Sequence, residues 1–316
     1  MNYTNKHHLP EYLVKILSNE WYSGANAKHD FSVTGFNQPV PLTILEQRHR
    51  DEIKEDVSDT FIQLLGVGFH SLSEQALKDD IMYQTEERNF ILFDGYTISG
   101  QYDLYIPSTK TLVDYKVTKA SSFIYGTKKD DYNLQMNLNK YILKQHGIEV
   151  KNMHIVELYR DYSKGQEKYN SAYPPLGINI IECDEYTDAV VEYKVAKFIQ
   201  EYNRLKNLPD NMLPPCSPEE RWEKGGEYAV MKQGGKRALK LFKTKNEAEI
   251  YRNNNCDMNI TFIEKRPVEL TRCNEWCRVN QWCPFYQAHL QGIKQEAINE
   301  DNKGNQATSD KFKDIF

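Results

Sequence analysis

Two strand-like runs joined by a short turn occupy residues 97–119, and each run carries one aspartate among apolar neighbours. The segment reads TISGQYDLYIPSTKTLVDYKVTK, with Asp103 in the first run and Asp114 in the second. Side chains alternate between the two faces of a strand, so Asp114 and Lys116 emerge on one face and Tyr115 on the other. Burying a charged group in an apolar setting costs free energy unless it has a partner. The pattern therefore predicts that Asp103, Asp114 and Lys116 meet at one place.

Two carboxylates that lie close together repel each other unless a cation joins them. Hard divalent ions such as Mg²⁺ favour carboxylate and carbonyl oxygen ligands. Beside such an ion, Lys116 would position a water molecule and stabilise the charge that builds on a phosphate. The simpler alternative is a surface hairpin with an ordinary Asp–Lys ion pair, because this spacing is common by chance.

The stretches GQYDLYI and LVDYKV resemble the PD-(D/E)XK nuclease superfamily, and specifically its RecB-like branch. The resemblance implies an α/β fold with a restriction-endonuclease-like core, in which a central mixed β-sheet is flanked by helices. It also implies a metal-dependent DNA nuclease that uses Mg²⁺ or Mn²⁺. The implied metal ligands are His70, Asp103, Asp114 and the backbone carbonyl of Tyr115. The implied catalytic residues are Asp103, Asp114, Lys116 and Gln135.

Two helical stretches carry the rest of this resemblance. LGVGFHSLSEQ resembles the helix that supplies a metal-binding histidine, His70, and LQMNLNKYIL resembles the glutamine motif that places Gln135 near the lysine. A histidine packed within its own helix and a solvent-facing glutamine are the alternatives. Glu74, one turn after the histidine, would support it or remain solvated. The family pattern expects a tyrosine where this chain has Asn139, and Tyr141 lies roughly 200° further round the helix.

A cysteine cluster follows late in the chain. TRCNEWCRVNQWCPFYQ contains Cys273, Cys277 and Cys283, and Cys216 lies earlier in LPPCSPEERW. Four thiolates suit a [4Fe–4S] cluster or a tetrahedral zinc ion. One distant cysteine before a late triplet resembles the iron–sulfur staple of RecB-like nucleases, so we expect that cluster. Zinc, and unligated thiols in an aromatic minicore, are the alternatives, and Cys256 is the reserve fourth ligand.

Basic residues suggest where nucleic acid binds. KVTKASSFIYGTKKDDY lies beside the proposed site and offers Phe123 and Tyr125 for base stacking, and KQGGKRALKLFKTK predicts a basic hairpin. Such a hairpin tracks phosphates without reading sequence, whereas a solvated hairpin is the alternative. We expect DNA, single-stranded or with ends, as the partner. The candidate contacts are Lys119, Lys128, Lys129, Lys236 and Arg237.

The length of 316 residues suits one large domain and a small one. Four prolines in LPDNMLPPCSPEERW mark the predicted boundary. We expect a nuclease core with an N-terminal helical part over residues 1–207, a subdomain with the basic hairpin and cysteine cluster over residues 208–292, and a flexible tail over residues 293–316. The tail ends in SDKFKDIF, and Phe312–Phe316 resembles a peptide that docks on a replication or recombination protein. A turn folded onto its own domain is the alternative.

Local patterns predict individual elements. SDTFIQLLGVGFHSLSEQAL predicts a helix, with Phe61, Leu65 and Leu72 among its apolar residues at roughly helical spacing, and Asp94–Gly95 predicts a hairpin turn. A strand, a helix and a strand in succession after residue 110 predict some parallel pairing.

The formal net charge of −5 confines nucleic-acid contacts to local basic patches. No apolar run approaches the roughly 20 residues that span a bilayer. We therefore expect no membrane contact and a cytoplasmic protein, with a virus-encoded protein acting in the host cytoplasm as an alternative. A catalytically inactive DNA-binding or assembly module and a zinc-stabilised interaction protein are the rival functions.

Overall fold

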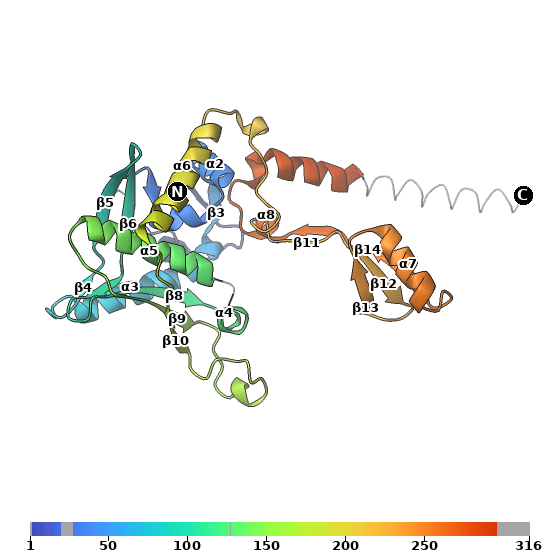
Figure 1. Cartoon of the computed structure of the whole chain (residues 1–316), viewed down its shortest axis with the longest axis horizontal. Coiled ribbons are helices and arrows are strands. Elements are labelled where there is room, and N and C mark those ends of the chain that lie inside the picture. The colour runs from blue at the N-terminus through green and yellow to red at the C-terminus, as the bar shows by residue number, and fades with distance from the viewer. Residues whose placement is uncertain (1, 20–27, 127, 296–316) are drawn as a thin grey trace, which may run out of the picture. The chain divides into compact units, whose positions relative to one another are not determined.

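The computed structural model describes residues 2–19, 28–126 and 128–295 (Figure 1). The chain divides into two compact units, Met1–Asn207 and Leu208–Phe316. The proposed docking segment Phe312–Phe316 and nearly all of the predicted tail lie outside the described residues. None of the helices in the described ranges is long and apolar enough to cross a membrane.

The first unit contains both the helices and the strands of an α/β fold. Its helices are α1 (Glu11–Leu17), α2 (Val40–Arg48), α3 (Phe61–Leu77), α4 (Ala120–Tyr125), α5 (Lys129–Gln145) and α6 (Asp188–Leu205). Its strands are β1 (Asn2–Thr4), β2 (Phe31–Ser32), β3 (Lys54–Asp56), β4 (Gln84–Thr85), β5 (Arg88–Phe93), β6 (Tyr96–Gln101), β7 (Leu104–Ile106), β8 (Thr111–Thr118), β9 (Asn152–Tyr159) and β10 (Ile178–Glu182).

The central sheet of this unit has the strand order β10-β9-β8-β7-β4. Strands β8 and β9 are parallel, and the other neighbouring pairs are antiparallel. Helix α5 connects the parallel pair and packs on one face of the sheet, where Met136 and Leu112 share a buried cluster with Ile155 (Figure 1). The predicted α/β class, with a mixed central sheet flanked by helices, is confirmed, and so is the parallel pairing.

Helix α3 covers the opposite face of β8. The ring of Phe69 lies 5.1 Å from the ring of Tyr115, centroid to centroid. The helix forms where the sequence predicts it, but its apolar residues do not form a buried stripe. Phe61, Leu65 and Leu72 are all exposed, and no residue of α3 is buried.

A second, smaller sheet has the order β2-β6-β5. Strands β5 and β6 form the predicted hairpin, with Phe93 opposite Tyr96 across the Asp94–Gly95 turn. Both turn residues have positive φ angles, 49° and 83°, as a type I′ turn requires. The chain passes between the two sheets twice: once from β4 to β5, and once from β6 to β7. These two crossings position the functional site.

Buried amides fasten α5 to its surroundings. Asn133 and Asn137 accept hydrogen bonds from the backbone amides of Asp184 and Tyr186, at 3.0 and 2.7 Å. These side-chain oxygens satisfy two backbone amides in the segment that follows β10. The polar residues within this helix therefore have structural partners.

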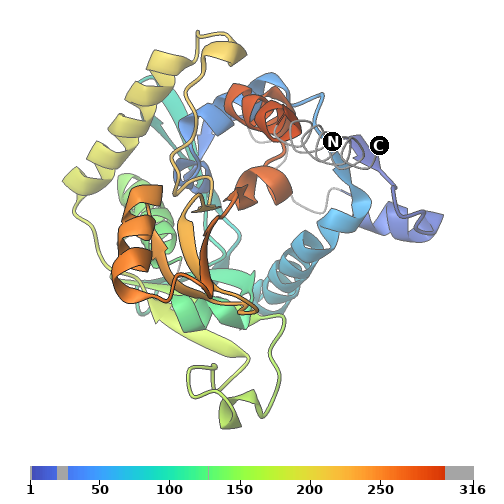
Figure 2. The same ribbon diagram turned by 90° about the vertical axis from the view of Figure 1, so that its right-hand side faces the viewer.

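The second unit is built on a two-stranded and a three-stranded sheet. Its strands are β11 (Glu223–Gly225), β12 (Tyr228–Lys232), β13 (Ala238–Phe242), β14 (Thr261–Lys265) and β15 (Val268–Leu270), and its helices are α7 (Lys245–Asn255), α8 (Thr271–Glu275) and a helix that includes residues 284–295. Strand β11 pairs with β15, and α7 packs against the sheet β13-β12-β14 (Figure 2). The predicted basic hairpin is β12–β13.

Candidate metal centre and cysteine cluster

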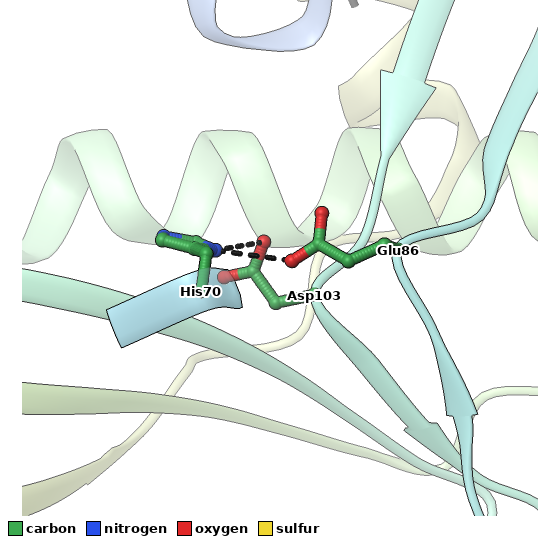
Figure 3. Close-up of side chains that lie close together, drawn as sticks. All are labelled: His70, Glu86 and Asp103. Atoms are coloured by element: carbon green, nitrogen blue, oxygen red, sulfur yellow. Dashed lines mark hydrogen bonds and ion pairs between the residues drawn. The ribbon is translucent and has the colours of Figure 1, made fainter. Parts of the chain in front are cut away.

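Three side chains from distant parts of the first unit converge in one place. Nδ1 of His70 lies 3.2 Å from Oε1 of Glu86 and 3.2 Å from Oδ1 of Asp103 (Figure 3). One potential ligand atom from each residue lies within 4.8 Å of the other two. Among the described residues, this is the group with the spacing of a metal site.

The two carboxylates occupy the crossings between the sheets. Glu86 lies between β4 and β5, Asp103 lies between β6 and β7, and the backbone amide of Glu86 donates to the carbonyl oxygen of Asp103 at 3.2 Å. Glu86 has a φ of 53°, a conformation that is uncommon for residues other than glycine and often found at functional sites. His70 reaches the pair from the middle of α3. The cluster therefore forms where the chain passes between the central sheet and the smaller sheet.

A second group of side chains adjoins the first. Nζ of Lys116 lies 2.6 Å from Oδ2 of Asp114, and Nε2 of Gln135 donates to Oδ1 of Asp114 at 2.5 Å. Asp103 links the two groups, because its Oδ2 accepts the backbone amide of Tyr115 at 2.6 Å. Asp103 and Asp114 are both buried.

The electrostatics of the centre favour a bound cation. Burial raises the pKa of Asp114 to about 6, with Lys116 opposing and Asp103 reinforcing the rise. Burial disfavours the charged form of His70, but its bonds to Asp103 and Glu86 outweigh this and raise its pKa to about 10. Two carboxylates, those of Asp103 and Glu86, thus lie against one imidazole. An ion would take over the neutralising role of the His70 proton.

Hydrogen bonds from neighbouring side chains orient Glu86. Nε2 of Gln101 donates to Oε2 of Glu86 at 2.6 Å, and the guanidinium of Arg88 donates to Oε1 of Gln101. The other oxygen of Glu86 therefore faces the histidine. Such supporting contacts hold ligands in position for a metal.

The structure brings the side chains of the predicted site residues together in two adjoining groups. His70 and Asp103 lie together, and Asp114, Lys116 and Gln135 lie together beside them. Gln135 bonds to Oδ1 of Asp114, and Lys116 contacts Oδ2 of the same carboxylate. Asp114 is not a member of the 4.8 Å group. The proposed metal contacts of Asp114 and the Tyr115 carbonyl stay predictions.

Glu86 is the residue that the sequence analysis missed. The expected support for His70, Glu74, is exposed, and Glu86 contacts the histidine instead. The available signal was the acidic pair Glu86–Glu87 directly before a strand-like run. Acidic residues before strands are common, so this signal alone does not distinguish a ligand from a solvated turn.

The structure explains why position 139 is not tyrosine. Asn139 is buried, and a Cβ atom added to Gly100 would lie only 2.4 Å from its Oδ1. Strand β6 and α5 therefore approach too closely for a large ring. Another tyrosine of α5, Tyr132, donates its hydroxyl to buried Glu157 at 3.0 Å, and Glu157 is the β9 partner of Lys116.

The predicted nucleic-acid contacts are all exposed. Lys119 precedes α4, and Lys128 precedes α5. Lys129 is paired with Asp184, whose Oδ2 lies 2.9 Å from its Nζ. Lys236 and Arg237 lie in the β12–β13 connection of the second unit.

In the second unit, the four predicted cysteines gather around α8. Cys273 lies within α8, and Cys277 and Cys283 follow it. Burial, the Glu220 carboxylate and the thiols of Cys283 and Cys277 raise the pKa of Cys216 to about 12.

Burial also raises the pKa of the Cys273 thiol. Burial and the thiols of Cys273 and Cys283 raise the pKa of Cys277 to about 11. No three cysteine sulfurs in the described ranges lie within 4.8 Å of one another. The reserve ligand, Cys256, is the C-cap of α7.

No protein-family model matches the chain, and no curated protein matches it either. A solved structure described as SSO0001 has 17% sequence identity and a TM-score of 0.45, covering 63% of this chain and 87% of that chain. A phage-related exonuclease from Haemophilus somnus 129PT has 14% identity and a TM-score of 0.29, covering 61% of this chain and 80% of that chain. Similarity at this level does not establish a shared activity.

Proposed function

We propose that the chain is a divalent-metal-dependent nuclease that hydrolyses phosphodiester bonds in DNA. One observation carries the proposal: His70, Glu86 and Asp103 converge beside a buried Asp114–Lys116 pair. A nitrogen ligand with carboxylate oxygens suits Mn²⁺ or Mg²⁺. The resemblance of GQYDLYI and LVDYKV to RecB-like nucleases supports exonuclease or end-processing work in recombination, repair or replication.

The proposed mechanism gives each side chain a role. His70, Glu86, Asp103 and Asp114, with the Tyr115 carbonyl, would hold one or two ions. When bound, such an ion polarises a phosphoryl oxygen and lowers the pKa of water.

The residues of the chain then provide orientation and charge. Lys116 lies next to Asp114, and its side chain is 28% exposed, so its ammonium can donate to water or to a phosphate oxygen. Gln135 holds the Asp114 carboxylate through one oxygen and leaves the lysine beside the other. This fixed arrangement would align water for in-line attack on phosphorus, with release of the 3′ oxygen.

We also propose that Cys216, Cys273, Cys277 and Cys283 hold a [4Fe–4S] cluster that stabilises the second unit. The proximity of four thiols around α8, one buried and three half-buried, supports a bound group. One distant cysteine before the late triplet resembles the iron–sulfur staple of RecB-like nucleases, and this resemblance supports the cluster over a tetrahedral zinc ion.

A cleavage assay tests the proposed activity. End-labelled single-stranded and duplex DNA is incubated with the full chain in Mg²⁺, Mn²⁺ or EDTA. We expect metal-dependent cleavage that is lost in Asp114→Ala and Lys116→Ala but kept in the exposed control Asp79→Ala. Cleavage that persists in both site variants contradicts the mechanism. Metal-dependent DNA binding without any cleavage would instead indicate an inactive module.

A further inference from the structure

The segment between β9 and β10 is a long, ordered loop, which we call the tyrosine loop (residues 160–177). Both views show it projecting from the end of the sheet (Figures 1 and 2). The rings of Tyr162 and Tyr173 stack with centroids 5.9 Å apart. The Tyr162 hydroxyl donates to the carbonyl oxygen of Pro175 at 2.9 Å, and the Tyr173 hydroxyl accepts the amide of Ser163 at 2.8 Å. Two tyrosines thus close the base of the loop.

A third tyrosine is presented to solvent. Tyr169 is 92% exposed and lies between Tyr162 and Tyr173 along the chain. Long loops in compact domains are usually functional when they are ordered. A solvent-exposed aromatic ring on a structured loop offers a flat surface on which another ring can stack.

The tyrosine loop starts beside the α4 loop (residues 119–126). The amide of Arg160 donates to the carbonyl oxygen of Thr118 at 2.9 Å, and the amide of Ala120 donates to the carboxylate of Asp161 at 2.7 Å. Because β8 and β9 are parallel, both loops leave the same edge of the sheet.

This edge lies next to the proposed catalytic strand. The α4 loop begins three residues after Lys116, and it presents Phe123 and Tyr125, which are 38% and 73% exposed. The Phe123 ring also contacts the ring of Tyr159 at the start of the tyrosine loop, with centroids 6.3 Å apart. Exposed aromatic rings therefore extend outward from the site.

The lysines of this region differ in their ion pairing from the lysines on the surface of α5. There, lysines are neutralised by acids, as in the pairs Lys129–Asp184, Lys140–Glu185 and Lys144–Asp188. At the sheet edge the described residues provide no ion-pair partner for four exposed cations, which are Lys119, Lys128, Lys164 and Lys168. The acids of the tyrosine loop are Asp161, which caps the α4 amide, and half-buried Glu167.

We propose that the tyrosine loop and the α4 loop together form a stacking platform for single-stranded nucleic acid. Tyr125 and Tyr169 stack on unpaired bases, and Lys164 and Lys168 contact the phosphates. Paired bases in a duplex do not offer the faces that these rings require. The inference rests on the proposed nuclease function, since it assigns the substrate class of that site, but binding is measured separately from cleavage.

The test uses the full chain in EDTA, so that no cleavage occurs. The probe is a single-stranded oligonucleotide containing 2-aminopurine, whose fluorescence falls when the base stacks, and binding is followed by anisotropy. We expect Tyr125→Ala and Tyr169→Ala each to weaken binding by roughly 5- to 100-fold and to reduce the quenching. Lys164→Gln with Lys168→Gln should flatten the dependence of affinity on salt.

Matched controls lie elsewhere on the first unit. Tyr193 on α6 is 66% exposed, and Tyr193→Ala and Lys197→Gln should leave binding unchanged. Wild-type affinity in both loop-tyrosine variants, or an equal loss of duplex binding, overturns the proposal. If the wild type binds single strands through these tyrosines but cleaves no DNA with any metal, the platform stands and the proposed nuclease function fails.

Discussion

The backbone amide of Glu86 donates a hydrogen bond to the backbone carbonyl oxygen of Asp103, with nitrogen and oxygen 3.2 Å apart. This bond joins the two crossings between the sheets and holds both carboxylates on the same histidine. A local turn could not produce it, because the two residues belong to separate connections. The relationship makes Glu86 a full member of the candidate metal centre.

Neutralising Glu86 should therefore weaken metal binding. Because its carboxylate lies 3.2 Å from His70, we expect Glu86→Gln to lower Mn²⁺ affinity by roughly 10- to 100-fold and to slow DNA cleavage. Calorimetric titration of Mn²⁺ into each protein measures the change. The control Glu74→Gln alters an exposed carboxylate on α3 and should bind Mn²⁺ like the wild type. Equal affinity in the Glu86 variant would remove this residue from the centre.

Metal binding should release a proton from His70. Its pKa of about 10 keeps the metal-free imidazole protonated at pH 7, and a metal ligand must be deprotonated. Affinity for Mn²⁺ should rise about tenfold per pH unit from pH 7 to 9. Calorimetry in two buffers of different ionisation enthalpy counts the protons. We expect about one for the wild type and none for His70→Gln; identical counts would contradict the proton displacement.

The metal-free protein should lose stability as Asp114 ionises. Its folded pKa of about 6 lies above the ordinary 3.8, so the folded state holds a proton that the unfolded chain releases between these values. The free energy of unfolding should therefore fall as pH rises through this window, with the full cost present above about 6.

Urea denaturation in EDTA at several pH values checks this expectation. At pH 7.5, Asp114→Asn should be more stable than the wild type by roughly 1–3 kcal/mol, since its side chain carries no charge to bury. Asp79→Asn, at an exposed position, should follow the wild-type pH profile. A less stable Asp114→Asn protein at pH 7.5 would show that the Lys116 pairing outweighs burial.

The close approach of α5 to β6 should make any side chain at position 100 destabilising. An added Cβ would lie 2.4 Å from Oδ1 of Asn139 and 2.8 Å from Cδ1 of Ile142. We expect Gly100→Ala to lower the free energy of unfolding by roughly 1–3 kcal/mol in urea denaturation. Gly66→Ala in α3 meets nothing within 4 Å and should instead be neutral or stabilising, as alanine favours helices. Equal stability of the two variants would contradict this packing argument.

Metal analysis should separate the cysteines by role. Cys216→Ser should lose the iron and the brown colour of the protein purified without oxygen, because one of four proposed ligands is gone. Cys256→Ser, at the end of α7, should keep both. The measurement is the iron, zinc and acid-labile sulfide content per chain. Zinc without sulfide in the wild type would replace the cluster with a zinc site.

The sequence alone determined the features that depend on local periodicity. Alternation along β8 places Asp114 and Lys116 on one face, and the structure shows their side chains 2.6 Å apart. The Asp94–Gly95 hairpin follows from its two turn residues, and the parallel β8–β9 pair follows from the order of strand, helix and strand along the chain. These predictions succeeded because neighbouring residues on a strand or turn have a fixed geometry.

Only the tertiary structure decided which side chains complete the centre. Glu86 contacts His70 and approaches Asp103 where the chain passes between the two sheets. Gln135 bonds to Asp114 because α5 packs on the face of β8 that carries this aspartate. The exposure of Phe61 on α3, despite its apolar spacing, was equally absent from the pattern. Periodicity states which residues share a face, whereas the contacts of that face depend on how distant segments pack.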